Sequence, residues 1–162
     1  MPGTGIVLNS RLGRGAYLIE GDPNEVRARR HPMRTLNVWM VGDGHRPALI
    51  GGTPGGDGQV RWNMQLISHL VDHGCAPQEA VQAPRTTVHP GSDADVIGSP
   101  LRLRAKDRFG TDVLAALATA GFPLDTLPPY GSGGLAQVIT RRRDGVLFGG
   151  SDPRGEGRAL GL

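Results

Sequence analysis

Residues 51–59 read Gly-Gly-Thr-Pro-Gly-Gly-Asp-Gly-Gln, and this stretch decides how the centre of the chain folds. It follows an apolar run at 47–50 that is typical of a strand, and it leads into an amphipathic stretch that predicts a helix. Glycines permit positive φ angles and a close approach of the backbone to a ligand. A strand, a glycine loop and a helix start can aim backbone N–H groups at an anion or a developing oxyanion. A tight strand-to-helix turn that binds nothing is the alternative.

Two familiar nucleotide-binding loops do not fit this stretch. A phosphate-binding Walker loop needs a lysine and then a serine or threonine after its last glycine, whereas Gln59 and Val60 follow Gly58. The dinucleotide pattern Gly-x-Gly-x-x-Gly also fails at this register, and no acidic residue closes a βαβ unit downstream. The loop is therefore predicted to act through backbone hydrogen bonds, and no cofactor is expected.

The composition favours one domain with a buried core and no nucleic-acid partner. The chain has 162 residues, and seventeen of its eighteen basic residues are arginine, yet its net charge is only +3. Basic clusters at 27–30 and 141–143 are typical of solvated loop and strand ends. A nucleic-acid surface would need a broader basic stripe and more aromatic rings.

The single cysteine and the N-terminus exclude several other classes. Cys75 is the only cysteine, so an intrachain disulfide and cysteine metal-ligand spacing are absent. The N-terminus lacks the basic segment and long apolar stretch of a signal peptide, and no segment is long enough to span a membrane. As written, the sequence predicts a soluble, cytoplasmic chain without a membrane partner. An upstream segment would change this expectation.

The apolar spacing and the turn residues predict an α/β layered domain. Helices are expected at 59–73, 77–81 and 112–120. The first of them carries a stripe of Trp62, Leu66, Leu70 and His73. Strands are expected at 5–9, 37–41, 48–50, 101–104, 135–140 and 145–148, with hairpin turns near 42–44 and 143–144.

Two histidine patterns suggest chemistry but are assigned structural roles. His69 and His73 have the spacing of zinc proteases, but Leu70 stands where the catalytic glutamate is needed. We expect surface and helix-end histidines there, and no metal. The run Thr-Thr-Val-His at 86–89 lacks an acidic partner and an oxyanion donor, and it is typical of strand residues.

Taken in order, the motifs of this chain resemble those of the γ-glutamyltransferase family, in the C-terminal part of its small subunit. The resemblance rests on Thr-Pro-Gly-Gly at 53–56, Ala-Pro-Arg at 83–85 and Ser-Asp-Pro-Arg at 151–154. Further matches lie at 5–9, 31–33, 72–74, 78–82 and 134–139. Together they cover nearly the whole chain in the family's order and spacing.

This resemblance implies part of the αββα sandwich of an N-terminal-nucleophile hydrolase, as one partial small-subunit domain over 1–162. In that family a precursor cleaves itself, and the new N-terminal threonine attacks an amide with its own α-amine as the base. An α-amine with a pKa of about 7.7–8.0 suits that role. The family's paired glycines donate N–H groups to the tetrahedral intermediate, and they correspond to Gly55 and Gly56.

The family's nucleophile is not found in this sequence. The Thr-Thr-His start of the family's small subunit lies upstream of the strand that corresponds to 5–9, and Thr86-Thr87 follows the Ala-Pro-Arg motif instead. The isolated chain is therefore expected to be inactive without two partners, the N-terminal part of the small subunit and the large subunit. We also expect it to be insoluble or to self-associate, because missing strands leave sheet edges and an apolar face exposed.

The residues that recognise the glutamyl group in the family are replaced here. Arg14 corresponds to the aspartate that pairs with the α-amine, and Arg34 and Thr35 to the serines that bind the α-carboxylate. An arginine repels an ammonium group but can hold a carboxylate in a bidentate fork. With Arg11 as a further candidate, we expect a small anionic amide without an α-amine, as in the oxamate-amidohydrolase or acylase-like branches. The alternative is that these arginines are solvated loop residues.

Three functions are compatible with the sequence. The leading one is a piece of an amidohydrolase or acyltransferase that supplies the oxyanion hole and one pocket wall. The second is a standalone, non-catalytic domain for binding or assembly, which a monodisperse, cooperatively melting monomer would favour. The third is an orphan fragment from a misplaced start codon or a degraded gene.

Overall fold

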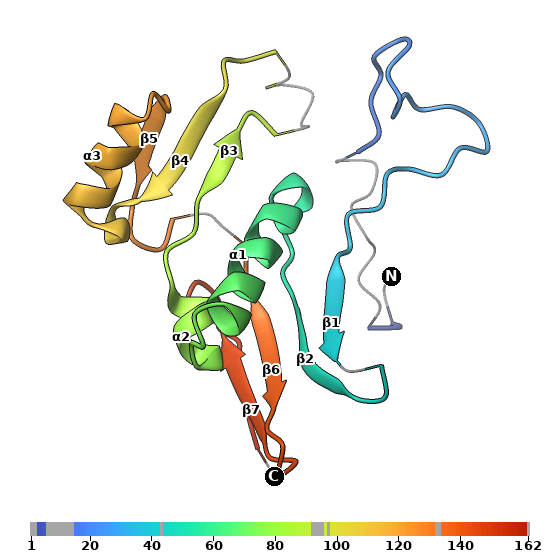
Figure 1. Cartoon of the computed structure of the whole chain (residues 1–162). Coiled ribbons are helices and arrows are strands. Elements are labelled where there is room, and N and C mark those ends of the chain that lie inside the picture. The colour runs from blue at the N-terminus through green and yellow to red at the C-terminus, as the bar shows by residue number, and fades with distance from the viewer. Residues whose placement is uncertain are drawn as a thin grey trace.

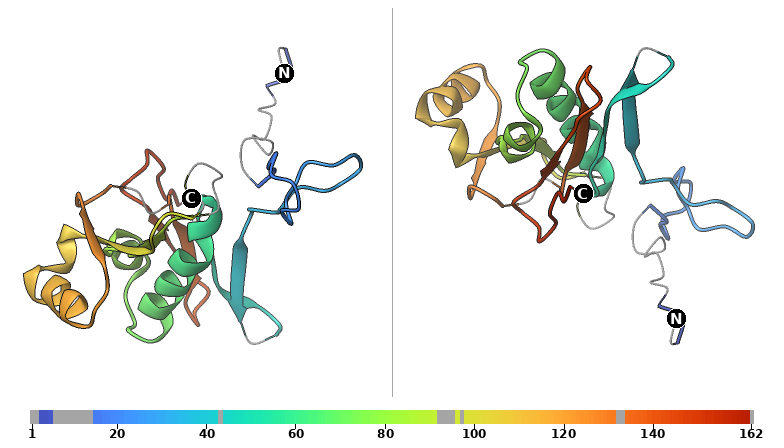
Figure 2. Two further views of the ribbon diagram at one scale, coloured as in Figure 1. Left: turned by 90° about the horizontal axis from the view of Figure 1, so that it is seen from above. Right: turned by 90° about the horizontal axis from the view of Figure 1, so that it is seen from below.

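The computed structural model describes residues 3–5, 15–42, 44–91, 96, 98–131 and 134–161. This part of the chain forms two sheets and three α-helices, and residues 15–37 form a long loop to one side (Figures 1 and 2). None of the described helices is long and apolar enough to cross a membrane. The architecture is α/β, as the sequence predicts.

The larger sheet is built from two hairpins. It contains β1 (Val38–Gly42), β2 (Pro47–Gly52), β6 (Gln137–Arg141) and β7 (Leu147–Ser151), all antiparallel, in the order β1-β2-β6-β7. Gly145 turns the second hairpin with a φ of 89°, a conformation that glycine adopts without strain. The hairpins join through β2 and β6, so segments about ninety positions apart share one sheet.

One face of this sheet packs against α1 (Gln59–Val71) and α2 (Pro77–Gln82) (Figure 1). Leu66, Val81, Ala136 and Val138 form the buried core, with Trp39 packed against it. Two glycines of the sheet allow close contacts, Gly51 with the neighbouring strand β1 and Gly150 with α2. A Cβ on Gly51 would overlap the Trp39 ring, and a Cβ on Gly150 would overlap the backbone of Pro77.

The opposite face of the larger sheet is apolar and largely open. The alternating register places Val38, Met40, Ile139 and Leu147 on that face, and all four side chains are exposed. The C-terminal segment crosses its β7 side, where Ala159 lies against Gly149 and Gly157 lies against Ser151. The exposed apolar face expected from the sequence is therefore present.

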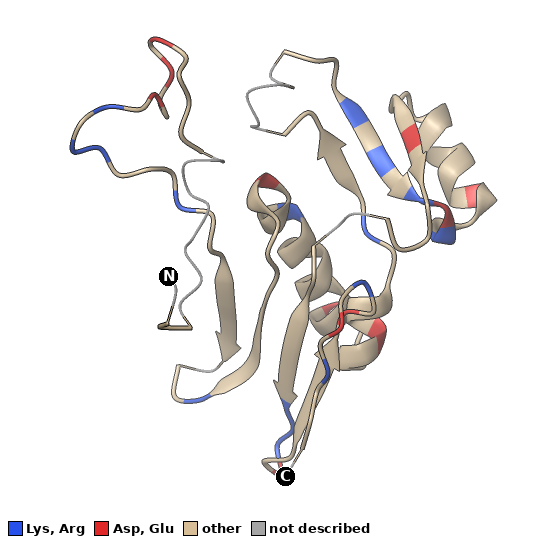
Figure 3. Cartoon of the chain, turned by 180° about the vertical axis from the view of Figure 1, so that it is seen from behind, with Lys and Arg blue, Asp and Glu red and all other residues tan. Residues whose placement is uncertain are grey.

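The smaller sheet contains β3 (Thr87–His89), β4 (Arg102–Lys106) and β5 (Leu124–Leu127). β3 is antiparallel to β4, whereas β5 is parallel to it, and the turn η3 (Asp107–Phe109) and helix α3 (Thr111–Thr119) make the crossover. Basic residues alternate with apolar ones along β4 (Figure 3), and Arg102 and Arg104 share the Asp125 carboxylate. The Gln65 side chain exchanges two hydrogen bonds with the backbone of Thr86, which ties this sheet to α1.

Most predicted elements are confirmed within two or three residues, but three details differ. The expected strand at 5–9 lies outside the described residues except for Gly5. Strand β5 is not predicted from the sequence. His73 is exposed and lies beyond the end of α1, because the backbone turns away at Gly74 with a φ of 64°. Gln59 and Asn63 complete the buried stripe of α1 instead.

Candidate functional site

Gly55 and Gly56 lie between the end of β2 and the short turn η2 (Gly56–Gly58) that leads into α1. Their φ angles are 137° and 56°, values that residues with a side chain rarely adopt. Within the described part of the chain, neither N–H group donates to a carbonyl or a side chain. Two adjacent, unpaired N–H groups ahead of a helix N-terminus are suited to an anion or an oxyanion.

The loop is held on one side by the segment that leads into β6. Thr53 is buried, and its hydroxyl donates to the carbonyl oxygen of Pro54 at 2.9 Å. Gly134 lies so close that a Cβ there would be 2.8 Å from the same carbonyl oxygen. Since Gly134 also has a positive φ of 74°, this position requires glycine on two grounds, its conformation and its contacts.

The indole of Trp62 fills the space directly behind the loop. A Cβ built on Gly55, Gly58 or Gly134 would lie less than 3.0 Å from its ring. The ring is buried, and no group of the described residues accepts a hydrogen bond from its Nε1. Gln59, one turn earlier on α1, is also buried with its Oε1 unpartnered. Buried polar atoms without partners are uncommon and concentrate where a structure serves a function.

Asn63 connects α1 to the segment that carries two of the predicted substrate residues. Its Oδ1 accepts a hydrogen bond from Trp39 Nε1 at 3.0 Å, and its Nδ2 donates to the Asn37 carbonyl at 3.4 Å. Asn37 follows Arg34 by three residues and Thr35 by two. The helix behind the glycine loop therefore also anchors the end of the predicted recognition segment.

The predicted substrate residues are only partly described. Arg34 is exposed and Thr35 is half-buried. Arg11 and Arg14 lie outside the described residues. A shallow pocket of about 60 Å³ lies next to this segment and is lined by residues between Ala16 and Pro32. It is far smaller than typical ligand pockets of about 300–1,000 Å³, and the glycine loop does not line it.

A buried ion cluster joins two of the sequence motifs. Arg85 of Ala-Pro-Arg donates to the carboxylate of Asp152 of Ser-Asp-Pro-Arg, and both side chains are fully buried. Arg154 pairs with Oδ1 of this carboxylate at 2.8 Å, and the Ala136 N–H donates to Oδ2, the oxygen that also accepts from Arg85, at 3.0 Å. Burial alone would raise the pKa of Asp152, but the hydrogen bonds from Arg85 and Ala136 outweigh it and lower the pKa below its usual value.

Lys106 extends this cluster at the end of β4. Burial, with the positive charges of Arg154 and Arg85 nearby, lowers the pKa of its ammonium group to about 8. The Tyr130 ring lies against the guanidinium groups of Arg108 and Arg154, at 4.7 and 5.6 Å from the ring centroid. Both motifs carry the family resemblance, but the contact between them is not predicted from the sequence. Charged residues are mostly exposed, so no local pattern indicates this contact.

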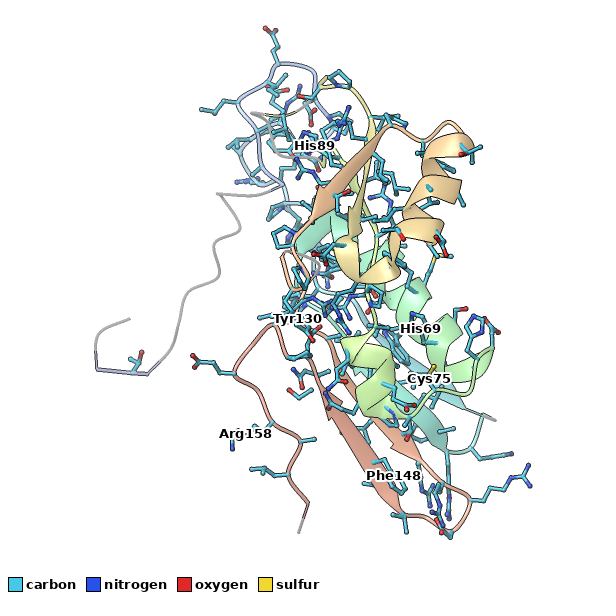
Figure 4. All side chains as sticks on the ribbon, turned by 90° about the vertical axis from the view of Figure 1, so that its left-hand side faces the viewer. His69, Cys75, His89, Tyr130, Phe148 and Arg158 are labelled. Atoms are coloured by element: carbon cyan, nitrogen blue, oxygen red, sulfur yellow. The ribbon has the colours of Figure 1, made fainter. Side chains whose placement is uncertain are left out.

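The histidines do not form a reactive group in the described part of the chain. The rings of His69 and His73 are 6.0 Å apart, and burial and the His73 charge lower the pKa of His69. His69 and Cys75 lie near α2, whereas His89 lies toward the far end of the molecule (Figure 4). Among the described residues, no three histidine, cysteine or acidic side chains are grouped as a metal site would require.

Comparison with known proteins identifies a common origin for these motifs. A family model described as Gamma-glutamyltranspeptidase matches residues 1–162. The chain is 32% identical to the Glutathione hydrolase-like YwrD proenzyme of Bacillus subtilis (strain 168), over 98% of this chain and 30% of that protein. It is 30% identical to the Oxamate amidohydrolase proenzyme of Klebsiella pneumoniae, over 99% of this chain and 30% of that protein.

Solved structures share the fold. The cephalosporin acylase from Bacillus halodurans matches with a TM-score of 0.78 and 28% identity, over 97% of this chain and 28% of that chain. Solved gamma-glutamyltranspeptidases match as well, so the N-terminal-nucleophile hydrolase fold expected from the motifs is confirmed. The chain spans about 30% of the length of the curated relatives it matches.

Proposed function

Because this chain belongs to the gamma-glutamyltranspeptidase family, we propose that it supplies the oxyanion hole and one wall of the substrate pocket of an amide hydrolase or acyltransferase. The observation that carries the proposal is the pair of adjacent N–H groups of Gly55 and Gly56 ahead of α1, which donate to none of the described residues. Donors of this kind stabilise the oxyanion of the tetrahedral intermediate, and removing one typically lowers kcat by about 10²–10³.

In this proposal the nucleophile is an N-terminal threonine carried by polypeptide outside these 162 residues. Its hydroxyl oxygen attacks the amide carbon while its α-amine takes the proton. The carbonyl oxygen becomes negative and accepts hydrogen bonds from Gly55 and Gly56. Collapse of the intermediate expels the protonated amine and leaves an acyl-enzyme, which water or an acceptor amine then cleaves. The remainder of the small subunit and the large subunit are the proposed partners that complete the pocket.

We propose further that the acyl group carries a carboxylate and no α-amine. Arg34 and Thr35, together with Arg14 and Arg11, are the residues that would bind the carboxylate. The link from Asn37 through Asn63 to α1 supports this role, because it holds the end of the Arg34 segment on the helix that follows the glycine loop. The similarity to an oxamate amidohydrolase and to a cephalosporin acylase also supports a substrate other than glutathione.

Three p-nitroanilides that differ by one group each test the substrate class. The γ-glutamyl compound has both an α-amine and an α-carboxylate, the glutaryl compound lacks the amine, and the 4-aminobutyryl compound lacks the carboxylate. With the full-length gene product that contains these residues, we expect the highest kcat/KM for glutaryl-p-nitroanilide and the lowest for the 4-aminobutyryl compound. Gly55→Ala should lower kcat for all three.

The outcomes separate the two parts of the proposal. Efficient cleavage of the γ-glutamyl compound over the glutaryl compound would overturn the assigned substrate class but leave the oxyanion hole in place. A self-processed enzyme that hydrolyses amides equally well with Gly55→Ala would overturn the role of the loop. A correctly folded product that cleaves no amide, oxamate included, would overturn the enzymatic function.

A further inference from the structure

We propose that Trp62 is a positioning residue that sets the geometry of the oxyanion hole. The inference rests on the proposed function of Gly55 and Gly56 and adds a residue that the family motifs do not include. Trp62 does not reach the substrate in this proposal. It acts by fixing where the two backbone N–H groups point.

The contacts of the indole carry the proposal. The ring lies behind the loop and is bounded by glycines at 55, 58 and 134, each so close that a Cβ would lie less than 3.0 Å from it. These glycines come from both segments that shape the loop, the approach to α1 and the approach to β6. The position of the ring therefore determines how near the two segments can come to each other.

Gly58 shows that the ring, and not the backbone conformation, excludes a side chain at that position. Its φ and ψ angles are −70° and −21°, ordinary helical values that any residue adopts. A Cβ there would nevertheless overlap the six-membered ring of Trp62. At Gly55 the φ of 137° excludes a side chain independently of the ring. The two glycines therefore predict different responses to a change at Trp62.

Because its buried Nε1 donates to none of the described residues, Trp62 acts in this proposal through the shape of its ring. Burying an unsatisfied donor costs about 1–3 kcal/mol, and no described residue accepts from this N–H. A phenyl ring would keep an aromatic plane behind the loop without burying the donor. We therefore expect Trp62→Phe to preserve the loop and Trp62→Leu to loosen it.

Small displacements of the loop matter because oxyanion donors act over short distances. They must lie about 2.7–3.1 Å from the oxygen that becomes charged, and a misplacement of about 1 Å can lower the rate by about 10²-fold. The ground-state substrate depends less on these donors. A displaced loop should therefore lower kcat while KM changes little.

The test is a double-substitution cycle in the full-length gene product, assayed with glutaryl-p-nitroanilide. Gly58→Ala should lower kcat by about 10- to 100-fold, because the new methyl group pushes the loop away from the ring. Adding Trp62→Leu should restore kcat to near that of Trp62→Leu alone, since the smaller side chain makes room for the methyl group. The same addition should not rescue Gly55→Ala. Gly161→Ala, at a glycine with open space and no positive φ, is the matched control and should have no effect.

Different results of this test would overturn the inference and the proposed function. Unchanged kcat in Gly58→Ala, or a double variant no better than the product of the single effects, would overturn the inference. If Gly58→Ala does not fold, the kinetics of Trp62→Leu and Trp62→Phe test the inference instead. The inference requires a lower kcat in Trp62→Leu, with KM nearly unchanged, and a kcat within about threefold of wild type in Trp62→Phe. Equal kcat in both, with only their melting temperatures lowered, would mean a purely structural role. A wild-type enzyme without amidase activity would instead overturn the proposed function.

Discussion

At the scale of single residues, Arg34 tests how the proposed substrate is recognised. It is exposed on the segment that precedes β1, and its guanidinium group is the proposed partner of the substrate carboxylate. A hydrogen bond to a charged group contributes about 1.5–3 kcal/mol. We therefore expect Arg34→Gln to lower kcat/KM for glutaryl-p-nitroanilide by about 10- to 100-fold.

The matched control for Arg34 is Arg158, an exposed arginine of the C-terminal segment (Figure 4). Arg158→Gln removes the same charge and should leave kcat/KM unchanged. An equal loss in both variants would point to long-range electrostatic attraction instead of a bound carboxylate. Raising the salt concentration would weaken such an attraction in both variants alike.

The lowered pKa of Lys106 makes the stability of the folded protein change with pH in the alkaline range. Below about pH 8 its ammonium group is protonated in both the folded and the unfolded state, and its burial opposes folding. Between pH 8 and its ordinary pKa of 10.5, the folded state releases the proton while the unfolded state keeps it. The free energy of unfolding contributed by Lys106 should therefore rise across this window.

Urea melts at pH 7, 8, 9 and 10 measure this effect as the difference between wild type and Lys106→Met. Lys106 is the only lysine in the chain, so this variant removes all lysine titration. We expect wild type to gain stability relative to the variant as the pH rises. A constant difference from pH 7 to 10 would mean that Lys106 keeps its ordinary pKa in the folded protein.

At the scale of elements, the Arg85–Asp152 pair fastens the segment after α2 to the end of β7. Arg85→Met would leave a buried carboxylate with fewer partners, and breaking such a pair typically costs about 3–5 kcal/mol. Replacing both residues, as in Arg85→Met with Asp152→Leu, should cost less than the single change because no charge stays buried. Thermal or urea melts of the three proteins check this order.

The exposed pair Arg142–Asp144 in the turn between β6 and β7 is the control for the buried one. Arg142→Met should change stability by less than about 1 kcal/mol, as is typical of surface ion pairs. The loss of stability at acid pH is an independent measure of the contribution of Asp152. Because the pKa of Asp152 is lowered in the folded state, its stabilisation is present above its ordinary pKa and is lost as the pH falls through the lowered value. A similar loss of stability in both arginine variants would contradict the structural role of the buried pair.

The same elements show what local sequence patterns can predict. Helix α1 follows from its apolar spacing and its flanking glycines, and the two hairpins follow from their turn residues. Strand β5 has only four residues, and it pairs in parallel with β4 across a helix, so no local signal marks it. Arg85 and Asp152 are 67 positions apart, and their contact becomes visible only when α2 and β7 are packed together. The glycine loop predicts backbone hydrogen bonding to an anion or an oxyanion, whereas the family resemblance is what points to Gly55 and Gly56 as the proposed oxyanion donors.

At the scale of the whole molecule, the open face of the larger sheet predicts that the isolated chain self-associates. Met40 lies on this face and is 68% exposed, whereas Met64 is 66% exposed on α1. Met40→Lys should therefore shift the isolated chain toward monomer in sedimentation experiments, because it places a charge within the apolar face. Met64→Lys, with an equally exposed methionine, should not. Equal effects of both would mean that net charge, and not this face, controls association.

The close contacts between the large sheet and its helices also limit how the sequence can change over time. Where Gly150 on β7 meets the backbone of Pro77 on α2, the two layers touch with no side chain between them, and within the sheet the Trp39 ring lies directly against Gly51. Ordinary drift replaces one core side chain by another of similar volume, but here any replacement adds atoms to occupied space. In a library of random variants, folded proteins with a substitution at Gly51 or Gly150 should be very rare. Glycines with open surroundings, such as Gly21 and Gly98, do not have this steric conflict. The distance between the sheet and its helices can therefore change in evolution only if both residues of such a contact change together.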